Sequence, residues 1–284
     1  MVRPFHTAWA ETATFYPHQR SSAHFRTSSR SSGRIADALA RIVLEQWNRL
    51  RRPEDFTVTD VGADDGHLLD AIRSRIPSHV QPRMRWRAVD FVEGECDADW
   101  IVADIRRVEL PHSPGVLIAQ ELLDDIPCTI VENNEHGHPW VLGIDDDALP
   151  IPVEPLHSHN DLTWLDTWWP DETPFATREV GLSRDRVWQR LRASVTAGVA
   201  IAIDYGHVRE ERRCGRWAGG TVRGFRSGRV VRPIPDGRCN ITAHVAMDSL
   251  AAAPLLRQSE VTGIGGAEGD LLWLIDDRGA SCAS

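Results

Sequence analysis

The sequence contains no lysine, so all 32 of its basic side chains are arginine. No apolar run approaches the roughly 20 residues that a membrane-spanning helix needs, so we expect a soluble, cytoplasmic protein with no membrane partner. The five cysteines are scattered and form no C-x-x-C pair. That spacing fits a reducing compartment and excludes both a disulfide framework and a zinc site. A net charge of -9 argues against nucleic acid as a partner.

A chain of 284 residues that is 42% hydrophobic can form one large domain or two small ones. We expect an N-terminal helical segment, 1–52, that packs on a core domain, 53–284. The Arg- and Ser-rich stretch 18–34 has the composition of a targeting peptide. It has no apolar core, however, and we interpret it as part of the mature chain.

Hydrophobic residues recur at helical spacing from residue 34 to 50, and the Ser-Ser-Gly before them offers cap residues. This pattern predicts an amphipathic helix. From residue 56 onward, short apolar stretches alternate with helical ones, which indicates a parallel sheet covered by helices on both faces. The expected elements are strands 56–61, 85–90, 100–103 and 115–119, and a helix over 66–75.

The pattern is looser after residue 128, and we expect an inserted region at about 128–182. This region starts with "CTIVENNEHGHPWVLGID", which is typical of two strands around an Asn/Gly turn. A helix that Ser183 caps and Gly198 closes should follow it. The remaining expected elements are a strand over 199–203, a helix near 241–253 and two closing strands near 259–263 and 271–275.

The turn after the first strand, "DVGADDG" at 60–66, resembles a nucleotide-binding loop with one glycine missing. A helix N-terminus favours phosphates, but Asp60, Asp64 and Asp65 would repel those of a dinucleotide. S-adenosylmethionine (SAM) instead presents a cationic sulfonium and an amino group, and Gly62 would let the backbone pass close to it. Asp also tolerates positive φ. We therefore interpret the loop as a SAM site; the alternative is an ordinary strand-to-helix turn.

Two more acids follow the next two strands. Asp90 ends the second strand, 24 residues after Gly66, where an acid in such a sheet binds ribose hydroxyls. Asp104 follows the third strand and could accept a hydrogen bond from an adenine amino group. Ligands of open α/β sheets lie at the carboxyl ends of the strands. Three acids at three successive strand ends therefore predict a ligand site at that edge.

Four later sequence motifs are more specific than the loop. They are "QELLDDIP" at 120–127, "IDYG" at 203–206, "GTVR" at 220–223 and "NITAHV" at 240–245. With "HFRTSSRSSGRIADAL" at 24–39, they resemble the MidA family of SAM-dependent methyltransferases. That family includes the mitochondrial complex I assembly factor that acts on a protein arginine. The words appear in the family's order over residues 20 to 250. Three departures are Asp64 for a loop glycine, "DFVEG" for an E-x-S-P word, and Gln120 for an asparagine.

The resemblance implies an α/β fold of the class I methyltransferase, Rossmann-like type. This fold has a mostly parallel twisted sheet with helices on both faces, here with the N-terminal helical segment and an inserted middle region. It also implies SAM as the cofactor. The implied cofactor-binding residues are Asp60, Gly62, Ala63, Asp64, Gly66, Asp90, Asp104 and Gln120.

The resemblance further implies a protein arginine as the methyl acceptor. A guanidinium is always charged and forms bidentate pairs with carboxylates, so the catalytic candidates are Glu121 and Asp124, with Asp204 third. A helical turn after the fourth strand would bring Glu121 and Asp124 to one side. In an alternative interpretation, Asp124 only caps that turn. The candidates for substrate binding are Tyr205, His207 and Arg223, although packing and hydrogen bonding of the loop would also explain Tyr205 and His207.

Two other functions remain open at this stage. One is a methyltransferase that acts on an oxygen or nitrogen of a small molecule. The other is a non-catalytic assembly factor with a degenerate SAM pocket, which Asp64 and the missing E-x-S-P word would fit. Calorimetric titration with SAM distinguishes a binder from a non-binder.

Overall fold

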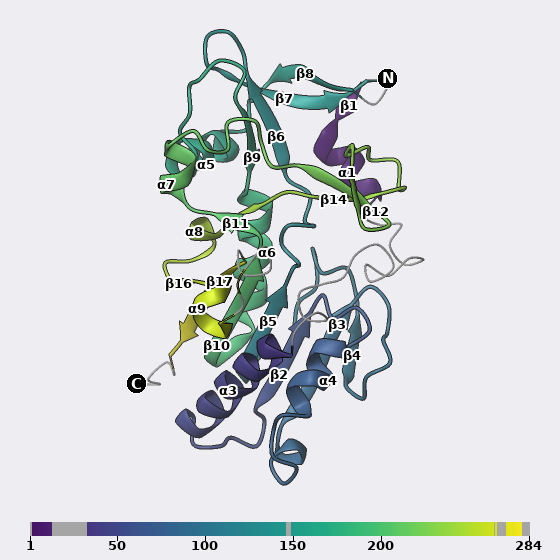
Figure 1. The fold of residues 1–284 in the computed structure, drawn as a ribbon, viewed down its shortest axis with the longest axis vertical. Coiled ribbons are helices and arrows are strands. Elements are labelled where there is room, and N and C mark those ends of the chain that lie inside the picture. The colour runs from purple at the N-terminus through teal and green to yellow at the C-terminus, as the bar shows by residue number, and fades with distance from the viewer. Residues whose placement is uncertain (1, 13–32, 146–148, 264, 266–270, 280–284) are drawn as a thin grey trace. The chain divides into compact units, whose positions relative to one another are not determined.

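The computed structural model describes residues 2–12, 33–145, 149–263, 265 and 271–279 (Figure 1). The chain forms two compact units, each built from three separate stretches. Unit 1 comprises Met1–Phe25, Asp124–Arg186 and Gly206–Leu250, and unit 2 comprises Arg26–Leu123, Val187–Tyr205 and Ala251–Ser284. The predicted insertion at 128–182 lies within unit 1. The predicted N-terminal segment contributes to both units.

Unit 2 is an α/β unit around a mixed seven-stranded sheet of order β16-β17-β10-β5-β2-β3-β4. Strands β10, β5, β2, β3 and β4 are parallel to one another. At the other side of the sheet, β17 is antiparallel to β10, and β16 is antiparallel to β17. The mostly parallel sheet is therefore confirmed. The strands are β2 (Thr57–Val61), β3 (Arg85–Asp90), β4 (Asp99–Val102), β5 (Ser113–Gln120), β10 (Val195–Asp204), β16 (Leu255–Arg257) and β17 (Leu272–Arg278).

The middle strands of this sheet are buried on both faces. Every residue of β2 is buried, and so are the last six of β5 and the last seven of β10, as expected for parallel strands with covered faces. Two glycines pin the register at the start of these strands. A Cβ on Gly115 would lie 1.9 Å from the Thr57 carbonyl oxygen, and one on Gly198 would lie 1.9 Å from that of Gly115. Only glycine permits this approach.

Helices α3 (Arg34–Arg49) and α4 (His67–Arg73) lie in front of the sheet in Figure 1. The predicted apolar face of α3 is confirmed, since Ile35, Leu39 and Val43 are fully buried in the unit's core. Gly33 is the N-cap and makes no side-chain cap hydrogen bond. The serines expected to cap this helix, the targeting-like stretch and most of "HFRTSSRSSG" lie at 13–32, outside the described residues.

Unit 1 contains a five-stranded sheet of order β1-β7-β6-β9, with β8 paired to β7. The two strands predicted around the Asn/Gly turn are confirmed as β6 and β7. Buried residues on this sheet form two small cores, one with Phe5 and Trp9 and one with Trp164 and Trp169. The elements of the sheet and its helices are β1 (Arg3–Pro4), α1 (Phe5–Thr12), β6 (Thr129–Asn133), β7 (Pro139–Ile144), β8 (Pro150–Pro155), α5 (His159–Trp168) and β9 (Thr177–Val180).

The C-terminal part of unit 1 differs from the prediction. Residues 241–253, predicted as one helix, form two short strands and one helical turn, because Ile241 pairs with Gly224 and Val245 with Gly206. Pairing across the chain has overridden the helical pattern. The elements are β11 (Gly206–His207), α7 (Arg209–Arg213), β12 (Arg223–Arg226), β13 (Arg229–Val231), β14 (Asn240–Thr242), β15 (Val245–Ala246) and α8 (Met247–Leu250).

Two other predicted boundaries are wrong. The helix expected to run from Ser183 to Gly198 is α6 (Leu182–Ala193), and Gly198 lies inside β10. The strand expected at 259–263 is the short helix α9 (Gln258–Thr262). Glu260 accepts a hydrogen bond from the Arg257 N–H, and Gly263 closes this helix at φ 70°. These two caps stabilise a helix despite its β-branched residues.

Candidate functional site

The carboxyl ends of β2 and β5 are the natural place for a ligand in unit 2. β2 and β5 are neighbours in the sheet. After β2 the chain continues to β3 on one side, and after β5 it continues to β10 on the other side. Open α/β sheets bind ligands at such a switch point, outside the carboxyl ends of the strands. The acids predicted from the sequence lie at this edge.

The loop after β2 has the backbone conformation that its glycines suggested. Gly62 and Gly66 have φ of 79° and 85°, and Asp64 adopts a left-handed φ of 52°. The N–H groups of Gly62 and Ala63 donate to the Val89 carbonyl at 2.9 and 3.2 Å. The loop is thus bound to the end of β3, and Asp64 does occupy a position that usually favours glycine.

Asp90 connects this loop to the second strand end. Its Oδ2 accepts a hydrogen bond from the Asp64 N–H at 2.7 Å, and its Oδ1 accepts one from the Phe91 N–H at 2.6 Å. Each carboxylate oxygen can accept more than one hydrogen bond. Asp90 therefore fixes the loop backbone and keeps acceptor capacity for a hydroxyl, while its role toward ribose stays a prediction.

Asp60 is the most perturbed acid of the group. Its side chain is buried within β2, and burial raises the pKa of this carboxyl to about 7, with a further rise from the neighbouring Asp90. A carboxyl with a pKa near 7 changes charge in the physiological range. Such a group at the predicted cofactor edge fits a site that gains a cation.

Asp104 has a partner that the sequence did not suggest. It follows β4 by two residues, and the Arg106 side chain donates two hydrogen bonds of 2.9 Å to its two oxygens. Burial raises the pKa of Asp104, but hydrogen bonds and charge from Arg106 outweigh it, so the pKa lies below its ordinary value. The carboxylate is thus ionised and oriented by Arg106, and its role toward adenine stays a prediction.

Glu121 has a backbone conformation that is unusual for its residue type. It follows β5 directly, adopts φ 48°, and its N–H donates to the Ile203 carbonyl at 2.8 Å. Gln120 Nε2 donates to Glu121 Oε1 at 3.2 Å. Non-glycine residues in this region of φ cluster at functional sites. The helical turn predicted after the strand is wrong, because residues 121–124 form a bend that leads into a turn.

Asp204 ends β10 with a fully buried side chain. Its Oδ2 accepts from the Leu123 N–H at 2.8 Å and its Oδ1 from the Tyr205 N–H at 2.9 Å. The carboxylate thus holds the segment after β5 in place. This geometry favours a positioning role for Asp204. Tyr205 is partly buried against the core of unit 2.

Three predicted site residues belong to unit 1. The Asp124 main-chain oxygen accepts from Arg184 Nη2 at 3.0 Å. His207 is fully buried between Trp169 and Trp217, and its Nδ1 accepts from Arg212 Nη1 at 2.8 Å. Burial, and then the charge of Arg212, lowers the pKa of His207 well below its ordinary value. Arg223 is exposed. For His207, this environment favours the packing alternative.

Sequence reasoning missed the side chains that pack against the loop. A Cβ on Gly62 would lie 2.9 Å from Leu122 Cδ1, and one on Gly66 would lie 2.2 Å from Cys96 Sγ. Both glycines are therefore required by close neighbours as well as by their φ. Leu122 could have been found from its place beside Glu121, whereas Cys96 carried no recognisable signal.

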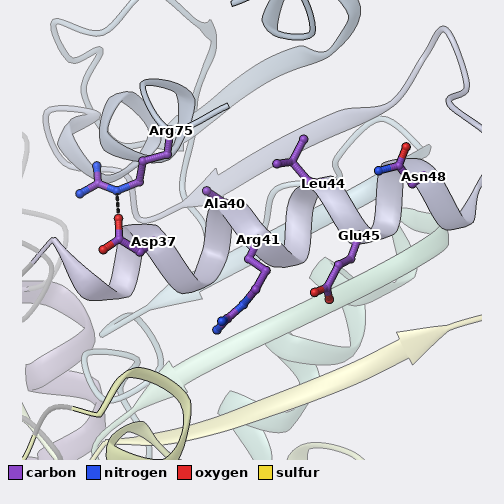
Figure 2. Close-up of a pocket in the computed structure, with 7 residues that line it drawn as sticks. All are labelled: Asp37, Ala40, Arg41, Leu44, Glu45, Asn48 and Arg75. Carbon is purple, nitrogen blue, oxygen red and sulfur yellow. Dashed lines mark hydrogen bonds and ion pairs between the residues drawn. The ribbon is translucent and has the colours of Figure 1, made fainter. Parts of the chain in front are cut away.

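A hollow of about 480 Å³ lies along the outward side of α3 (Figure 2). Ala40, Leu44 and Asn48 line it, and Asp37 forms an ion pair with Arg75 at one end. None of the acids at the strand ends lines this hollow. This hollow is therefore separate from the acids at the strand ends.

Comparisons with known proteins identify the family of the chain. The model of a family described as "Putative S-adenosyl-L-methionine-dependent methyltransferase" matches residues 38–263, so the chain belongs to that family. A Burkholderia thailandensis protein solved with S-adenosyl-homocysteine bound has a similar structure, with a TM-score of 0.77 at 19% identity. A native structure of a protein from the same organism gives 0.75 at 19% identity. Both alignments cover 99% of this chain and 89% of the other. No curated protein matches the sequence.

The chain is therefore a SAM-dependent methyltransferase. The residues at the strand ends fit this cofactor, because the edge carries carboxylates for a cation and for hydroxyls, and Gly62, at φ 79°, adds no side chain to the loop. Among the described residues, no helix has the length and apolarity to cross a membrane.

Proposed function

We propose that this methyltransferase is of the MidA type and transfers the methyl group to the guanidinium of a protein arginine. In this proposal, the α/β fold of unit 2 is the class I, Rossmann-like methyltransferase fold. The strand order and the switch point between β2 and β5 support this assignment. The proposal also takes the enzyme to be cytoplasmic. The observation that carries the acceptor is Glu121, a carboxylate held at a left-handed φ beside that switch point.

In this proposal, the loop after β2 and the end of β3 hold SAM. Asp90, already fixed against Asp64, would accept from the ribose hydroxyls, and Gly62 would let the backbone approach the ligand. Asp60 would supply negative charge near the cationic groups. SAM supplies an electrophilic methyl on a sulfonium. The bound state of a similar Burkholderia thailandensis protein, with S-adenosyl-homocysteine, supports this assignment.

The chain's own contribution to transfer is alignment of the acceptor. Glu121 would hold a guanidinium by charge-assisted hydrogen bonds and accept the proton that the nitrogen loses. Its orientation depends on Gln120, which donates to Oε1, and on the β5–β10 pairing through the Ile203 carbonyl. Asp204 accepts a hydrogen bond from the Leu123 N–H and so helps to fix the segment that follows Glu121. Positioning of this kind supplies much of the rate gain in a group transfer between two bound partners.

The test is Glu121→Gln, which keeps the size of the side chain and removes its charge. We expect SAM affinity to stay within a few-fold, while transfer to an arginine peptide falls ~100-fold or more, as for loss of a positioned acid–base group. The exposed Glu109 in the same unit provides the matched control, Glu109→Gln. Methylation is measured by mass spectrometry beside calorimetric SAM titration.

Each other outcome points to a different function. Unchanged transfer in Glu121→Gln would remove Glu121 from the mechanism. If a deletion strain lacks a methylated metabolite but keeps all of its methylated proteins, the enzyme acts on a small molecule. SAM binding without transfer to either class would identify an assembly factor.

A further inference from the structure

Unit 1 contains a pocket of its own, of about 250 Å³, on one side of its five-stranded sheet. Phe5, Ile130 and Leu142 give it an apolar lining, and two carboxylates, Glu132 and Glu179, also line it. Arg232 contributes from the segment after β13. The pocket is therefore apolar with a few polar groups, which is the usual composition of a small-molecule site.

The strand register explains why both carboxylates face this pocket. β6 and β9 are antiparallel, with Ile130 opposite Glu179 and Glu132 opposite Thr177. Residues two apart on a strand point to the same face, so all four side chains project to one side of the sheet. Glu132 and Glu179 are diagonal neighbours, roughly 7–8 Å apart on the backbone, a separation that one ligand bearing several N–H groups can bridge.

Glu179 has an unsatisfied oxygen. Its side chain is 2% exposed, Oε1 accepts from the Thr221 N–H at 2.6 Å, and among the described residues Oε2 has no hydrogen-bond partner. A buried carboxylate oxygen without a donor is costly. Burial raises the pKa of Glu179, against hydrogen bonds from Thr221 and the Val222 N–H and the charge of Arg184. A donor in the pocket would satisfy this oxygen.

Arg184 does not supply that donor. Its Nε, Nη1 and Nη2 each donate to a main-chain carbonyl, those of Ile126, His244 and Asp124. Its charge acts on Glu179 through space only. Gly220 leaves the space beside the carboxylate open, because a Cβ there would lie 2.9 Å from Glu179 Oε1.

We propose that this pocket binds a small organic cation, an alkylguanidinium or alkylammonium group. The cation's N–H groups donate to Glu179 and Glu132, and its carbon chain packs on Phe5, Ile130 and Leu142. The volume of about 250 Å³ lies below the ~300–1,000 Å³ of drug-sized sites, so the ligand has the size of one amino-acid side chain. The binding site does not depend on the methyl transfer proposed above.

The first experiment titrates the full chain with n-butylguanidinium, n-butylammonium and the neutral isostere n-butylurea. We expect the cations to bind and the urea to bind at least about 30-fold more weakly, since charge-assisted hydrogen bonds to a buried group are lost. Equal affinity for n-butylurea would overturn the proposal. An acetylated Gly-Arg-Gly amide tests whether the ligand is a free cation or the side chain of a peptide. If it is a peptide side chain, this amide should bind more tightly than n-butylguanidinium does.

The second experiment uses variants of the pocket. Glu179→Gln should weaken n-butylguanidinium binding about 30-fold, the range for a charged hydrogen bond, while Glu154→Gln, an exposed position on β8 of the same sheet, should not change it. Arg232→Gln removes a positive charge from the exposed edge of the pocket and should tighten binding slightly, because water screens this charge. Unchanged binding in Glu179→Gln, or weaker binding in Arg232→Gln, would contradict the proposal even if one variant proved unstable.

Discussion

Asp204 Oδ2 accepts a hydrogen bond from the Leu123 N–H at 2.8 Å, so the end of β10 fixes the segment that follows β5. The second oxygen of the same carboxylate accepts from Tyr205. Because the side chain is fully buried, both bonds are shielded from water. This one residue therefore couples the geometry of two neighbouring strand ends, and Glu121 lies between Gln120 of β5 and the segment that Asp204 holds.

The first prediction concerns Asp204→Asn. The amide keeps the shape of the side chain but has only one oxygen that can accept. Of the Leu123 and Tyr205 N–H groups, one therefore faces an NH₂ group and loses its acceptor. We expect the free energy of unfolding to fall by about 1–3 kcal/mol and transfer to fall more than SAM affinity. Denaturant unfolding and SAM titration measure the two effects. Asp97→Asn, at a fully exposed side chain, is the control, and equal stability of both variants would argue against the positioning role.

The second prediction concerns Gly62→Val. The new side chain meets Leu122 and a φ of 79°, so it should occupy the space beside the cofactor loop and weaken SAM binding at least about tenfold, or about 1.4 kcal/mol. Gly215 has φ 72°, and a Cβ at that residue would meet no other heavy atom within 4 Å. Gly215→Val therefore carries the same kind of backbone strain without the contact and should bind SAM normally. NAD should not bind the wild type, and micromolar NAD affinity without SAM affinity would refute the acidic-loop argument.

The third prediction concerns the pH dependence of SAM binding. If SAM binds best when Asp60 is ionised, a pKa of about 7 makes the apparent affinity about tenfold weaker at pH 6 than at pH 8, in proportion to the ionised fraction. Asp60→Asn should give a flat profile in this range, which separates Asp60 from any titration of SAM itself. Identical profiles in the two proteins would remove Asp60 from the binding equilibrium.

Stability should change with pH in the opposite direction. The folded-state pKa of Asp60 is raised from 3.8 to about 7, so between these values the folded state binds more protons than the unfolded state. The free energy of unfolding then falls by an amount on the order of 4 kcal/mol as the pH rises from about 4 to 7. Above pH 7 it stays level. Asp60→Asn should lose most of this slope in urea unfolding measured at pH 5 and 8.

The sequence predicted the sheet of unit 2 well because its strands are buried on both faces. The apolar residues of β2, β5 and β10 show no competing pattern, and Asp60 and Asp90 lie within the last two residues of β2 and β3. The left-handed φ of Asp64 was expected from its place between two glycines. Local information was sufficient for each of these features.

Other features depended on contacts that no local pattern contains. The left-handed φ of Glu121 depends on a hydrogen bond to Ile203, and the role of Asp204 depends on Leu123. Ile241 and Val245 pair with distant strands instead of forming a helix. The Glu179 pocket combines α1, strands β6 to β9 and two loops, so nothing in the neighbourhood of Glu179 in the sequence pointed to it.

The division of each unit into three separate stretches constrains how the chain can fold during synthesis. β2 and β5 precede the Asp124–Arg186 stretch of unit 1, but β10 pairs with β17 (Leu272–Arg278), so the sheet of unit 2 cannot be completed until residue 278 has been made. Unit 1 needs nothing beyond Leu250. The nascent chain therefore carries an unpaired edge of β5 while the Asp124–Arg186 stretch of unit 1 is translated, and an unpaired strand edge is prone to pair with other chains.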